Sequence, residues 1–207
     1  MNGREVFRDI AGRYDTLNRV LSLGRDGAWR RSAIDRLPGG RLLDLGAGTG
    51  AANRDFGDRE VVALDPGLEM LDRNSSVWRV LGFGERLPFA DGSFDSVFSA
   101  FVFRNLDSVP STLAEIHRVL RPGGAVGIVD LARPTGRTRR AVHRMGTAVL
   151  TPLVGLLAGS PREYAYLHRS LDSLPPPEVM LAASPLRVDE VWRMGVFGFV
   201  YGALLRK

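Results

Sequence analysis

The sequence predicts an α/β fold, a mostly parallel sheet of seven strands with helices on its faces, and three observations lead to this prediction. Between residues 39 and 132, short apolar runs alternate with helix-like segments, which is typical of parallel strands joined by helices. A glycine-rich loop, LGAGTG, directly follows the first of these runs. Residues 183–207 alternate between apolar and polar side chains around Gly195 and Gly198, which predicts a closing antiparallel hairpin.

The elements follow one another along a single domain. A chain of 207 residues matches one domain with a full core, because domains usually hold roughly 100–200 residues. Residues 1–38 are predicted to form a helical cap, because apolar residues recur there at helix spacing: Val6, Phe7, Ile10 and Ala11, then Trp29, Ala33, Ile34 and Leu37. In the nucleotide-binding core, residues 39–132, strands are expected at 41–45, 60–65, 77–82, 93–101 and 124–131. A helix from residue 111 and the turn LRPGG precede the last strand.

Residues 133–182 break this pattern. They carry proline-punctuated helical segments, and an insertion of this length in a compact fold usually forms a lid over the functional site. The longest apolar run, residues 148–158, is interrupted by Pro152 and falls short of the ~20 residues that a membrane-spanning helix needs. The start of the chain is charged from its fourth residue and lacks the apolar core of a signal peptide, so we expect a cytoplasmic protein.

Composition narrows the chemistry further. The sequence contains no cysteine, which excludes a disulfide framework, a thiolate zinc site and a cysteine nucleophile. The formal net charge is +5, and Lys207 is the only lysine. We attribute the excess of arginine to a GC-rich genome or a warm habitat. The alternative is attraction of the protein to nucleic acid or to phospholipid headgroups.

The glycine loop fits two kinds of nucleotide. Gly46, Gly48 and Ala51 satisfy the dinucleotide fingerprint, whereas Gly46, Gly48 and Gly50 satisfy the version found in methyltransferases that use S-adenosylmethionine. Asp44 ends the strand two residues before the loop. A carboxylate there disfavours a pyrophosphate but favours the sulfonium and ammonium of S-adenosylmethionine. Asp44 therefore favours S-adenosylmethionine as the cofactor.

Later segments strengthen this interpretation. Asp65 ends the second strand, where a carboxylate can accept both ribose hydroxyls of either cofactor. Met70, on the next helix, lies against the adenine or belongs to the core. The segments ERLPFADGSFDSVFSAF and HRVLRPGGAVGIVDL follow the loop at the spacing seen in class I methyltransferases.

Four segments together resemble the UbiE-type C-methyltransferases of ubiquinone and menaquinone biosynthesis, over nearly the whole chain. In YDTLNRVLSLGRDGAW the family pattern is kept except that Leu17 replaces a methionine and Asp26 a histidine. RVLRPGGAVGIVDLA matches the pattern around Arg-Val-aliphatic-Lys-Pro-Gly-Gly, and FVFRN resembles Phe-Gly-x-Arg-Asn. EYAYLHRSL resembles the family's Ser-Tyr-x-Tyr-Leu segment.

The resemblance implies a class I S-adenosylmethionine methyltransferase with a Rossmann-like fold. It also implies methylation of a ring carbon in a reduced prenylated quinone, demethylmenaquinol or a related benzoquinol. Arg104 would stabilise the phenolate or activate a water, and Asn105 would orient the substrate. The implied cofactor-binding residues are Asp44, Gly46, Gly48, Thr49, Gly50, Asp65, Met70, Phe83, Gly84 and Ala100, and the implied substrate-binding residues are Tyr14, Asn18, Phe101 and Tyr164.

Two departures from the family affect the cofactor site. Phe83 and Gly84 stand where the family has Asn-Ala or Asp-Ala, so the side chain that would bond the adenine amino group is missing. Ala100 replaces a serine that contacts the cofactor. A methyltransferase acting on another small molecule, and a S-adenosylmethionine-binding protein that has lost catalysis, therefore remain alternatives.

Individual residues also have structural alternatives. Arg104 could form a surface ion pair with Asp95 or Asp107, and Tyr14 and Asn18 could be capping or core residues. A nucleic-acid methyltransferase is disfavoured, because SAFVFRN stands where base-amino methyltransferases usually carry Asn/Asp-Pro-Pro-aromatic. No metal site is expected, since His143 and His168 have no carboxylate at ligand spacing.

The composition of the predicted lid suggests where the enzyme meets its methyl acceptor. The lid carries the basic run RTRRAVHR beside the apolar run AVLTPLVGLLA, which suits peripheral contact with the inner face of the membrane and entry of a lipid quinol. The alternative for the apolar run is an ordinary core or a homodimer interface.

Overall fold

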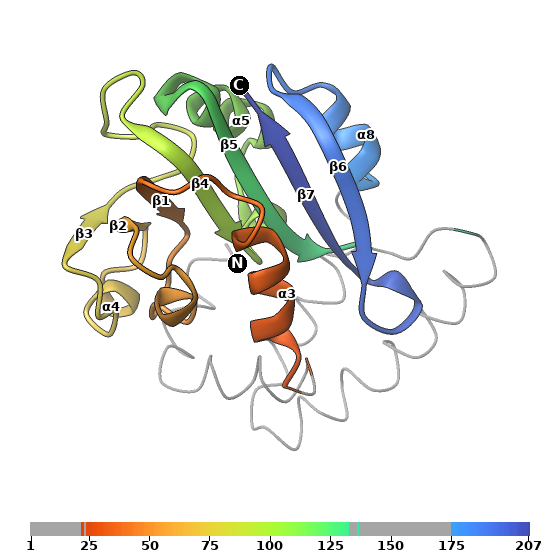
Figure 1. Ribbon diagram of the computed structural model, residues 1–207, viewed down its shortest axis with the longest axis horizontal. Helices are drawn as coiled ribbons and strands as arrows, with labels where there is room; N and C mark the ends of the chain where they lie inside the picture. Colours follow the sequence, from red (N-terminus) through yellow and green to blue (C-terminus); the bar gives the residue numbers. More distant parts are fainter. Residues whose placement is uncertain (1–21, 23, 133–135, 137–174) are drawn as a thin grey trace.

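The computed structural model describes residues 22, 24–132, 136 and 175–207. They build a seven-stranded sheet in the order β3-β2-β1-β4-β5-β7-β6 (Figure 1). The strands are β1 (Arg41–Leu45), β2 (Glu60–Asp65), β3 (Trp78–Leu81), β4 (Phe94–Ala100), β5 (Leu120–Leu131), β6 (Arg187–Met194) and β7 (Val200–Arg206). Strands β1 to β5 pair in parallel, and β7 runs antiparallel to both β5 and β6. The predicted α/β fold with its closing hairpin is confirmed.

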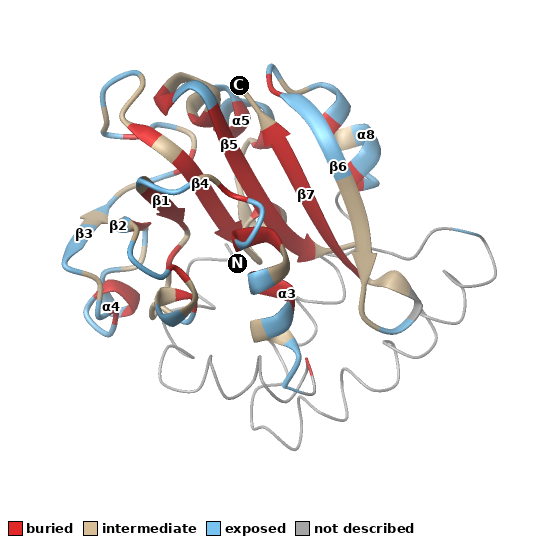
Figure 2. Cartoon of the chain, viewed as in Figure 1, coloured by how far each residue is buried: buried red, intermediate tan, exposed pale blue. Residues whose placement is uncertain are grey.

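Helices cover both faces of this sheet. The α-helices are α3 (Asp26–Ile34), α4 (Leu68–Leu71), α5 (Val109–Val119) and α8 (Pro177–Ala182), and the short 3-10 helices are η1 (Asn53–Asp55), η2 (Phe103–Asn105) and η3 (Val196–Gly198). On one face, α5 packs Leu113 and Ile116 against the core. On the other face, α3 packs Ala33 and Ile34 across β5 and β7. The central strands are therefore buried on both sides (Figure 2), which explains their nearly continuous apolar runs.

The alternation of side chains along β1 positions the functional site. Leu43 and Leu45 point to the face covered by α5, whereas Leu42 belongs to the core beneath α3. Successive strand residues point to opposite faces, so Asp44 shares the α3 face with Leu42. Asp44, the penultimate residue of β1, thus lies on the same side of the sheet as α3.

Some predicted boundaries hold and others differ. Strands β1 and β2 have the predicted bounds, α3 confirms the helix expected around Trp29, and β3 and β4 are each one residue shorter at both ends than expected. Strand β5 begins at Leu120 rather than 124, because Leu120 pairs with Phe94, and the register shifts over residues 121–124 before Ala125 pairs with Ser96. Helix α5 begins at Val109, two residues earlier than predicted, because the Ser108 side chain accepts a hydrogen bond from the Ser111 amide and caps the helix.

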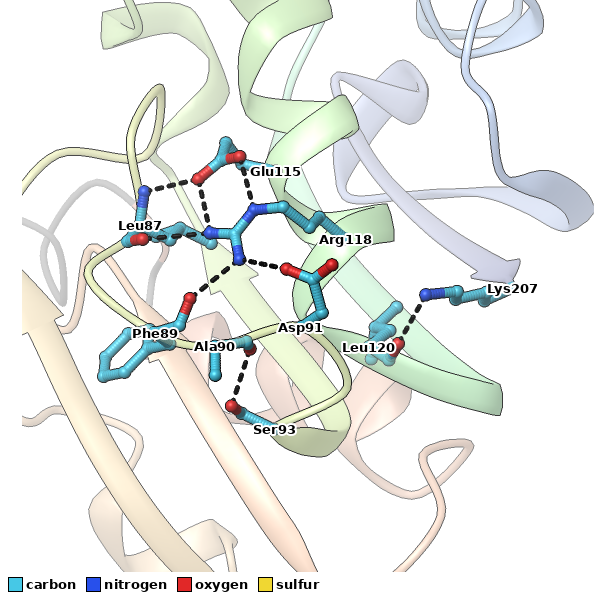
Figure 3. A network of polar contacts seen from close by, with 9 residues as sticks. All are labelled: Leu87, Phe89, Ala90, Asp91, Ser93, Glu115, Arg118, Leu120 and Lys207. Carbon is cyan, nitrogen blue, oxygen red and sulfur yellow. Dashed lines mark hydrogen bonds and ion pairs between the residues drawn. The ribbon is translucent and has the colours of Figure 1, made fainter.

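An arginine on α5 fixes the segment between β3 and β4 (Figure 3). The Arg118 guanidinium donates to the carbonyls of Leu87 (3.0 Å) and Phe89 (2.7 Å) and forms ion pairs with Glu115 and Asp91, each at 2.8 Å. Glu115 in turn accepts the Leu87 amide at 2.7 Å. Hydrogen bonding from Arg118 holds the pKa of Glu115 below its usual value. This network explains why LPF and HRVL occur together, because each needs the other to satisfy its polar groups.

Most of the predicted cap and lid lies outside the described residues. Within the ranges 1–38 and 133–182, the structure describes α3 and α8, and α8 packs Leu181 into the core beside β6. No helix among the described residues combines the length and the apolar composition that a membrane span requires.

Candidate functional site

A cavity of about 310 Å³ opens at the carboxyl ends of β1, β2 and β4, the edge where open α/β sheets bind ligands. Its wall includes the first three residues of the glycine loop, Gly46 to Gly48, and Thr49. Gly46 has a φ of 73°, and a Cβ there would lie 2.2 Å from Cγ2 of Val102. Only glycine fits at this position, because both the backbone conformation and the neighbouring valine exclude a side chain.

Asp65 connects the glycine loop to the second strand. Its Oδ2 accepts the Gly48 amide at 2.9 Å and its Oδ1 accepts the Gly67 amide at 2.8 Å. Burial raises the pKa of Asp65, and the two backbone hydrogen bonds oppose this shift. Each carboxylate oxygen can accept a second hydrogen bond. The geometry therefore leaves Asp65 able to accept two hydroxyls from a ligand in the cavity.

Asp44 is the most unusual side chain of the site. It is only 3% exposed and lines the cavity, yet it receives no hydrogen bond from the described residues, and its Oδ2 is buried without a partner. Burial, followed by repulsion from Asp65, raises the pKa of Asp44 to about 7, and Arg30 opposes the shift. A buried carboxyl without partners destabilises the fold, so its presence in a cavity indicates a functional group.

Arg30 is a residue of the site that the sequence did not single out. It comes from α3, lines the cavity and is nine-tenths buried. Its Nη2 pairs with Asp26 at 2.7 Å, and Asp26 also accepts a hydrogen bond from the Ser22 hydroxyl at 2.9 Å. Burial acts to raise the pKa of Asp26, but Arg30 and Ser22 outweigh it and lower that pKa. The spacing of Asp26 and Arg30, four residues apart on a helix, is the signal that could have identified this pair.

The end of β4 forms the opposite wall. Phe101 has a φ of 63°, and among the described residues it alone combines a positive φ with a side chain. The Phe101 amide donates to the Val129 carbonyl at 2.7 Å, and Nδ2 of Asn105 donates to the Phe101 carbonyl at 3.2 Å. Phe101, Asn105 and Ala100 all line the cavity. Backbone strain of this kind often occurs at functional sites.

Arg104 lies next to this wall in a buried ion pair. Its Nη1 is 2.7 Å from Oδ1 of Asp130, and the two side chains are 8% and 1% exposed. Its backbone amide also donates to Asp130, at 3.3 Å. This pair is neither of the surface pairs considered from the sequence, and Asp95 instead binds Arg121 at 2.6 Å. Arg104 itself is not among the residues that line the cavity.

The remaining predicted residues divide into three groups. Met70, Phe83 and Gly84 line the cavity, and Phe83 is 44% exposed at its rim. Gly50 does not line it: a Cβ there would lie 2.5 Å from Nδ2 of Asn53, so this glycine serves the turn. The substrate-binding candidates Tyr14, Asn18 and Tyr164 lie outside the described residues.

The charges around the cavity select a class of ligand. Among the described residues, one guanidinium lines the cavity, that of Arg30, and so do five carboxyl groups, those of Asp44, Asp65, Glu69, Glu85 and Asp107. Such a wall repels a pyrophosphate and attracts a cation. The buried carboxyl of Asp44 and the remaining acceptor positions of Asp65 suit a ligand that carries both positive charge and hydroxyl groups.

The sheet order, the closing antiparallel strands and the cavity over the glycine loop define a class I methyltransferase fold. Solved structures agree. A chain from the complex of the Haloferax volcanii Trm112 methyltransferase activator with a methyltransferase superposes with a TM-score of 0.71 at 19% identity, covering 97% of this chain and 96% of that one. A S-adenosylmethionine-dependent methyltransferase from Thermotoga maritima gives a TM-score of 0.65 at 18% identity, covering 98% and 99%.

The sequence comparisons identify the family. Residues 2–183 match the model of the ubiE/COQ5 methyltransferase family. A demethylmenaquinone methyltransferase from Beutenbergia cavernae is 38% identical over 91% of this chain and 81% of its own length. Another, from Thermus thermophilus, is 38% identical over 86% and 88%. The chain belongs to the ubiE/COQ5 methyltransferase family and is a methyltransferase.

Proposed function

We propose that this enzyme transfers a methyl group from S-adenosylmethionine to a ring carbon of a reduced prenylated quinone of the demethylmenaquinol type. The observation that carries the proposal is the chemistry of the two cavity walls. An unpartnered acid, Asp44, lies beside the glycine loop, and Asn105 lines the opposite wall next to the Arg104–Asp130 pair. The family and the names of the relatives support the acceptor.

The cofactor half of the cavity uses groups from three strands. Asp44 holds the positively charged end of the cofactor, and Asp65 accepts hydrogen bonds from the ribose hydroxyls. Gly46 and Gly48 let the backbone approach, with Thr49 beside them in the loop. Met70 and Phe83 flank the adenine, where the Gly84 backbone supplies a polar contact in place of the missing Asn or Asp side chain, and Ala100 completes the wall.

The acceptor half must stabilise negative charge on the quinol. When bound, S-adenosylmethionine supplies an electrophilic methyl group: a bond from the ring carbon to the methyl carbon forms, the bond to sulfur breaks with its electron pair on sulfur, and the ring carbon releases a proton to water. The electron density comes from an ionised ring hydroxyl, so a fixed cation nearby lowers the barrier. We assign this role to Arg104, which lies next to the wall that Asn105 lines but not in it, because a guanidinium stays protonated and Asp130 holds it in place. Asn105 orients the ring.

The acceptor's isoprenoid tail requires an apolar route. We propose that residues 133–182 form a lid that covers the site, that Tyr14, Asn18, Phe101 and Tyr164 contact the acceptor, and that the enzyme acts at the inner membrane surface as a peripheral protein. The basic run RTRRAVHR supports this, because each arginine near anionic headgroups contributes about 1 kcal/mol.

A transfer assay tests the proposal. Purified enzyme receives methyl-labelled S-adenosylmethionine and liposomes that contain either a demethylmenaquinol or a demethylated benzoquinol. We expect label in the naphthoquinol, and loss of label incorporation in Arg104→Ala but not in Arg121→Ala, which removes a surface arginine away from the cavity. Transfer to the benzoquinol alone would correct the acceptor, and transfer to neither would reject the quinol proposal.

A further inference from the structure

A row of polar side chains crosses three neighbouring strands near the carboxyl end of β5. Asp130 on β5 is directly opposite Tyr201 on β7, and Tyr201 is directly opposite Arg193 on β6 (Figure 1). Residues directly opposite each other on antiparallel strands have their side chains close together on the same face of the sheet. This face is the one that α8 covers, since Tyr201 shares its core cluster with Leu181. The row begins at the ion pair of Asp130 with Arg104.

Each member of this row has an incomplete set of hydrogen bonds. Tyr201 is 2% exposed and its hydroxyl has no partner, and Nε and Nη1 of Arg193 are buried without an acceptor. The Nη2 of Arg193 donates to both carboxylate oxygens of Glu178, at 2.7 and 3.0 Å. Among the described residues, Oδ2 of Asp130 accepts one hydrogen bond, from the Arg104 amide at 3.3 Å. A carboxylate oxygen can accept two hydrogen bonds, so Asp130 can take one more donor.

The two neighbours of Tyr201 determine how its hydroxyl can be used. A carboxylate only accepts hydrogen bonds, a guanidinium only donates them, and a hydroxyl does both. Tyr201 can therefore donate to Asp130 and accept from Arg193, but not the reverse. Burial, followed by the charge of Asp130, raises the pKa of Tyr201 well above its ordinary value; Glu178 adds to this shift, and Arg193 and Arg104 oppose it. The hydroxyl thus keeps the proton that a donor needs.

The role proposed for Arg104 creates a need for such a donor. Its guanidinium is 2.7 Å from Oδ1 of Asp130, and Arg104 lies next to the cavity wall but not in it. To stabilise a phenolate, the guanidinium must turn from Asp130 toward the acceptor. Asp130, which is 1% exposed, would then be a buried carboxylate without its counter-charge, and such a state is strongly destabilised.

We propose that Tyr201 is a positioning residue for the methyl transfer: its hydroxyl donates to Asp130 when the Arg104 guanidinium turns to the phenolate of the acceptor. Arg193 donates to the oxygen of the same hydroxyl. This inference rests on the proposed function. The exchange lowers the free-energy cost of releasing Arg104, and it gives a use to a buried hydroxyl that has no partner beside a buried ion pair.

A double-mutant cycle in stability tests this exchange without any substrate. In the unmodified enzyme, Tyr201→Phe removes a buried hydroxyl that has no partner, so the thermal midpoint of unfolding should stay the same or rise. In Arg104→Ala the guanidinium is absent and the hydroxyl should already bind Asp130. Adding Tyr201→Phe to that variant should therefore lower the midpoint by about 3–6 °C. Equal effects of Tyr201→Phe in the two backgrounds would overturn the exchange.

Turnover provides the second measurement. With methyl-labelled S-adenosylmethionine and liposomes that contain a demethylmenaquinol, Tyr201→Phe should lower kcat by about tenfold or more. The KM for S-adenosylmethionine should stay within about twofold, because Tyr201 does not line the cavity. Ser96→Ala is the matched control, since it removes another buried hydroxyl without a partner, from the face of the sheet that α3 covers. It should leave kcat unchanged.

The possible failures are distinguishable. If the unmodified enzyme methylates neither a demethylmenaquinol nor a demethylated benzoquinol, the proposed function is wrong and the catalytic part of this inference falls with it. The stability cycle still decides in that case whether Tyr201 can replace Arg104 on Asp130. If the enzyme is active but the cycle shows no reversal of sign, or Tyr201→Phe retains full kcat, the role of Tyr201 is wrong and the proposed function stands.

Discussion

Asp44 and Asp130 are the penultimate residues of β1 and β5, the strands on either side of β4, and they are almost equally buried, at 3% and 1% exposure, yet their surroundings are opposite. Asp130 pairs with Arg104 at 2.7 Å and accepts the Leu131 amide at 2.7 Å. Asp44 accepts nothing from the described residues. One carboxylate pairs with an arginine within the protein, whereas the other faces the cavity.

The backbone explains this difference. After β1, the amides of Gly46 and Ala47 donate to the Leu64 carbonyl at 2.8 and 3.0 Å, and the Gly48 amide donates to Asp65. The glycine loop thus directs its amides toward β2, and none reaches Asp44. At the end of β5, by contrast, the next amide turns back to Asp130, and η2 brings Arg104 beside it. Local chain direction therefore decides which buried acid remains available.

The largest effect should come from breaking the satisfied pair. Asp130→Asn removes the charge with which the buried Arg104 guanidinium pairs at 2.7 Å, and losing one member of a buried ion pair costs about 3–5 kcal/mol of unfolding free energy. Urea denaturation measures this loss. Asp91→Asn, which removes an 80% exposed partner of Arg118, should cost less than about 1 kcal/mol. Equal losses in the two variants would contradict the structural role assigned to Asp130.

Asp65 combines both kinds of environment, because it holds two backbone amides and also lines the cavity. In the proposed function Asp65 accepts two charge-assisted hydrogen bonds from the ribose, so we expect Asp65→Ala to lower S-adenosylmethionine affinity by about 2–4 kcal/mol. Calorimetry checks this, with Asp72→Ala as the control, since Asp72 is exposed outside the cavity wall. Unchanged affinity would remove Asp65 from the cofactor site.

The sequence was sufficient to predict the bounds of a strand where a single apolar run marked that strand. Strands β1 and β2 have the predicted bounds because each holds a largely buried apolar run that begins after a charged residue, Arg41 or Glu60. The site was less predictable. Arg30 is one arginine among many in the sequence, and its role depends on α3 lying over β1 and the cavity. The partner of Arg104 lies 26 residues away on a neighbouring strand, whereas sequence reasoning considered only nearer carboxylates.

Removing the charge of Asp44 should raise the free energy of unfolding, whereas removing the charge of Asp130 should lower it. Its folded-state pKa, about 7, lies above the ordinary value of 3.8, so its contribution to stability is fully present below pH 3.8 and is lost as the pH rises through about 7. Asp44→Asn should therefore gain about 2–3 kcal/mol relative to the unmodified enzyme between pH 5 and pH 8. Denaturation of both proteins at the two pH values measures this difference. A gain independent of pH would mean that Asp44 is already ionised in the free enzyme.

A substitution at Phe83 tests whether the proposed adenine end of the cavity also has a polar group available to the ligand. Because Phe83 is 44% exposed at the rim of the cavity, Phe83→Asp removes little buried surface and should cost less than about 1 kcal/mol of stability. The carboxylate restored there can accept a hydrogen bond from the adenine amino group, so S-adenosylmethionine should bind equally well or up to about tenfold more tightly. Calorimetry with S-adenosylmethionine and with 5′-methylthioadenosine should give the same gain, since both carry the adenine. A large loss with both would instead place the Phe83 ring against the adenine as an essential contact, and the Gly84 backbone would then not replace the missing side chain.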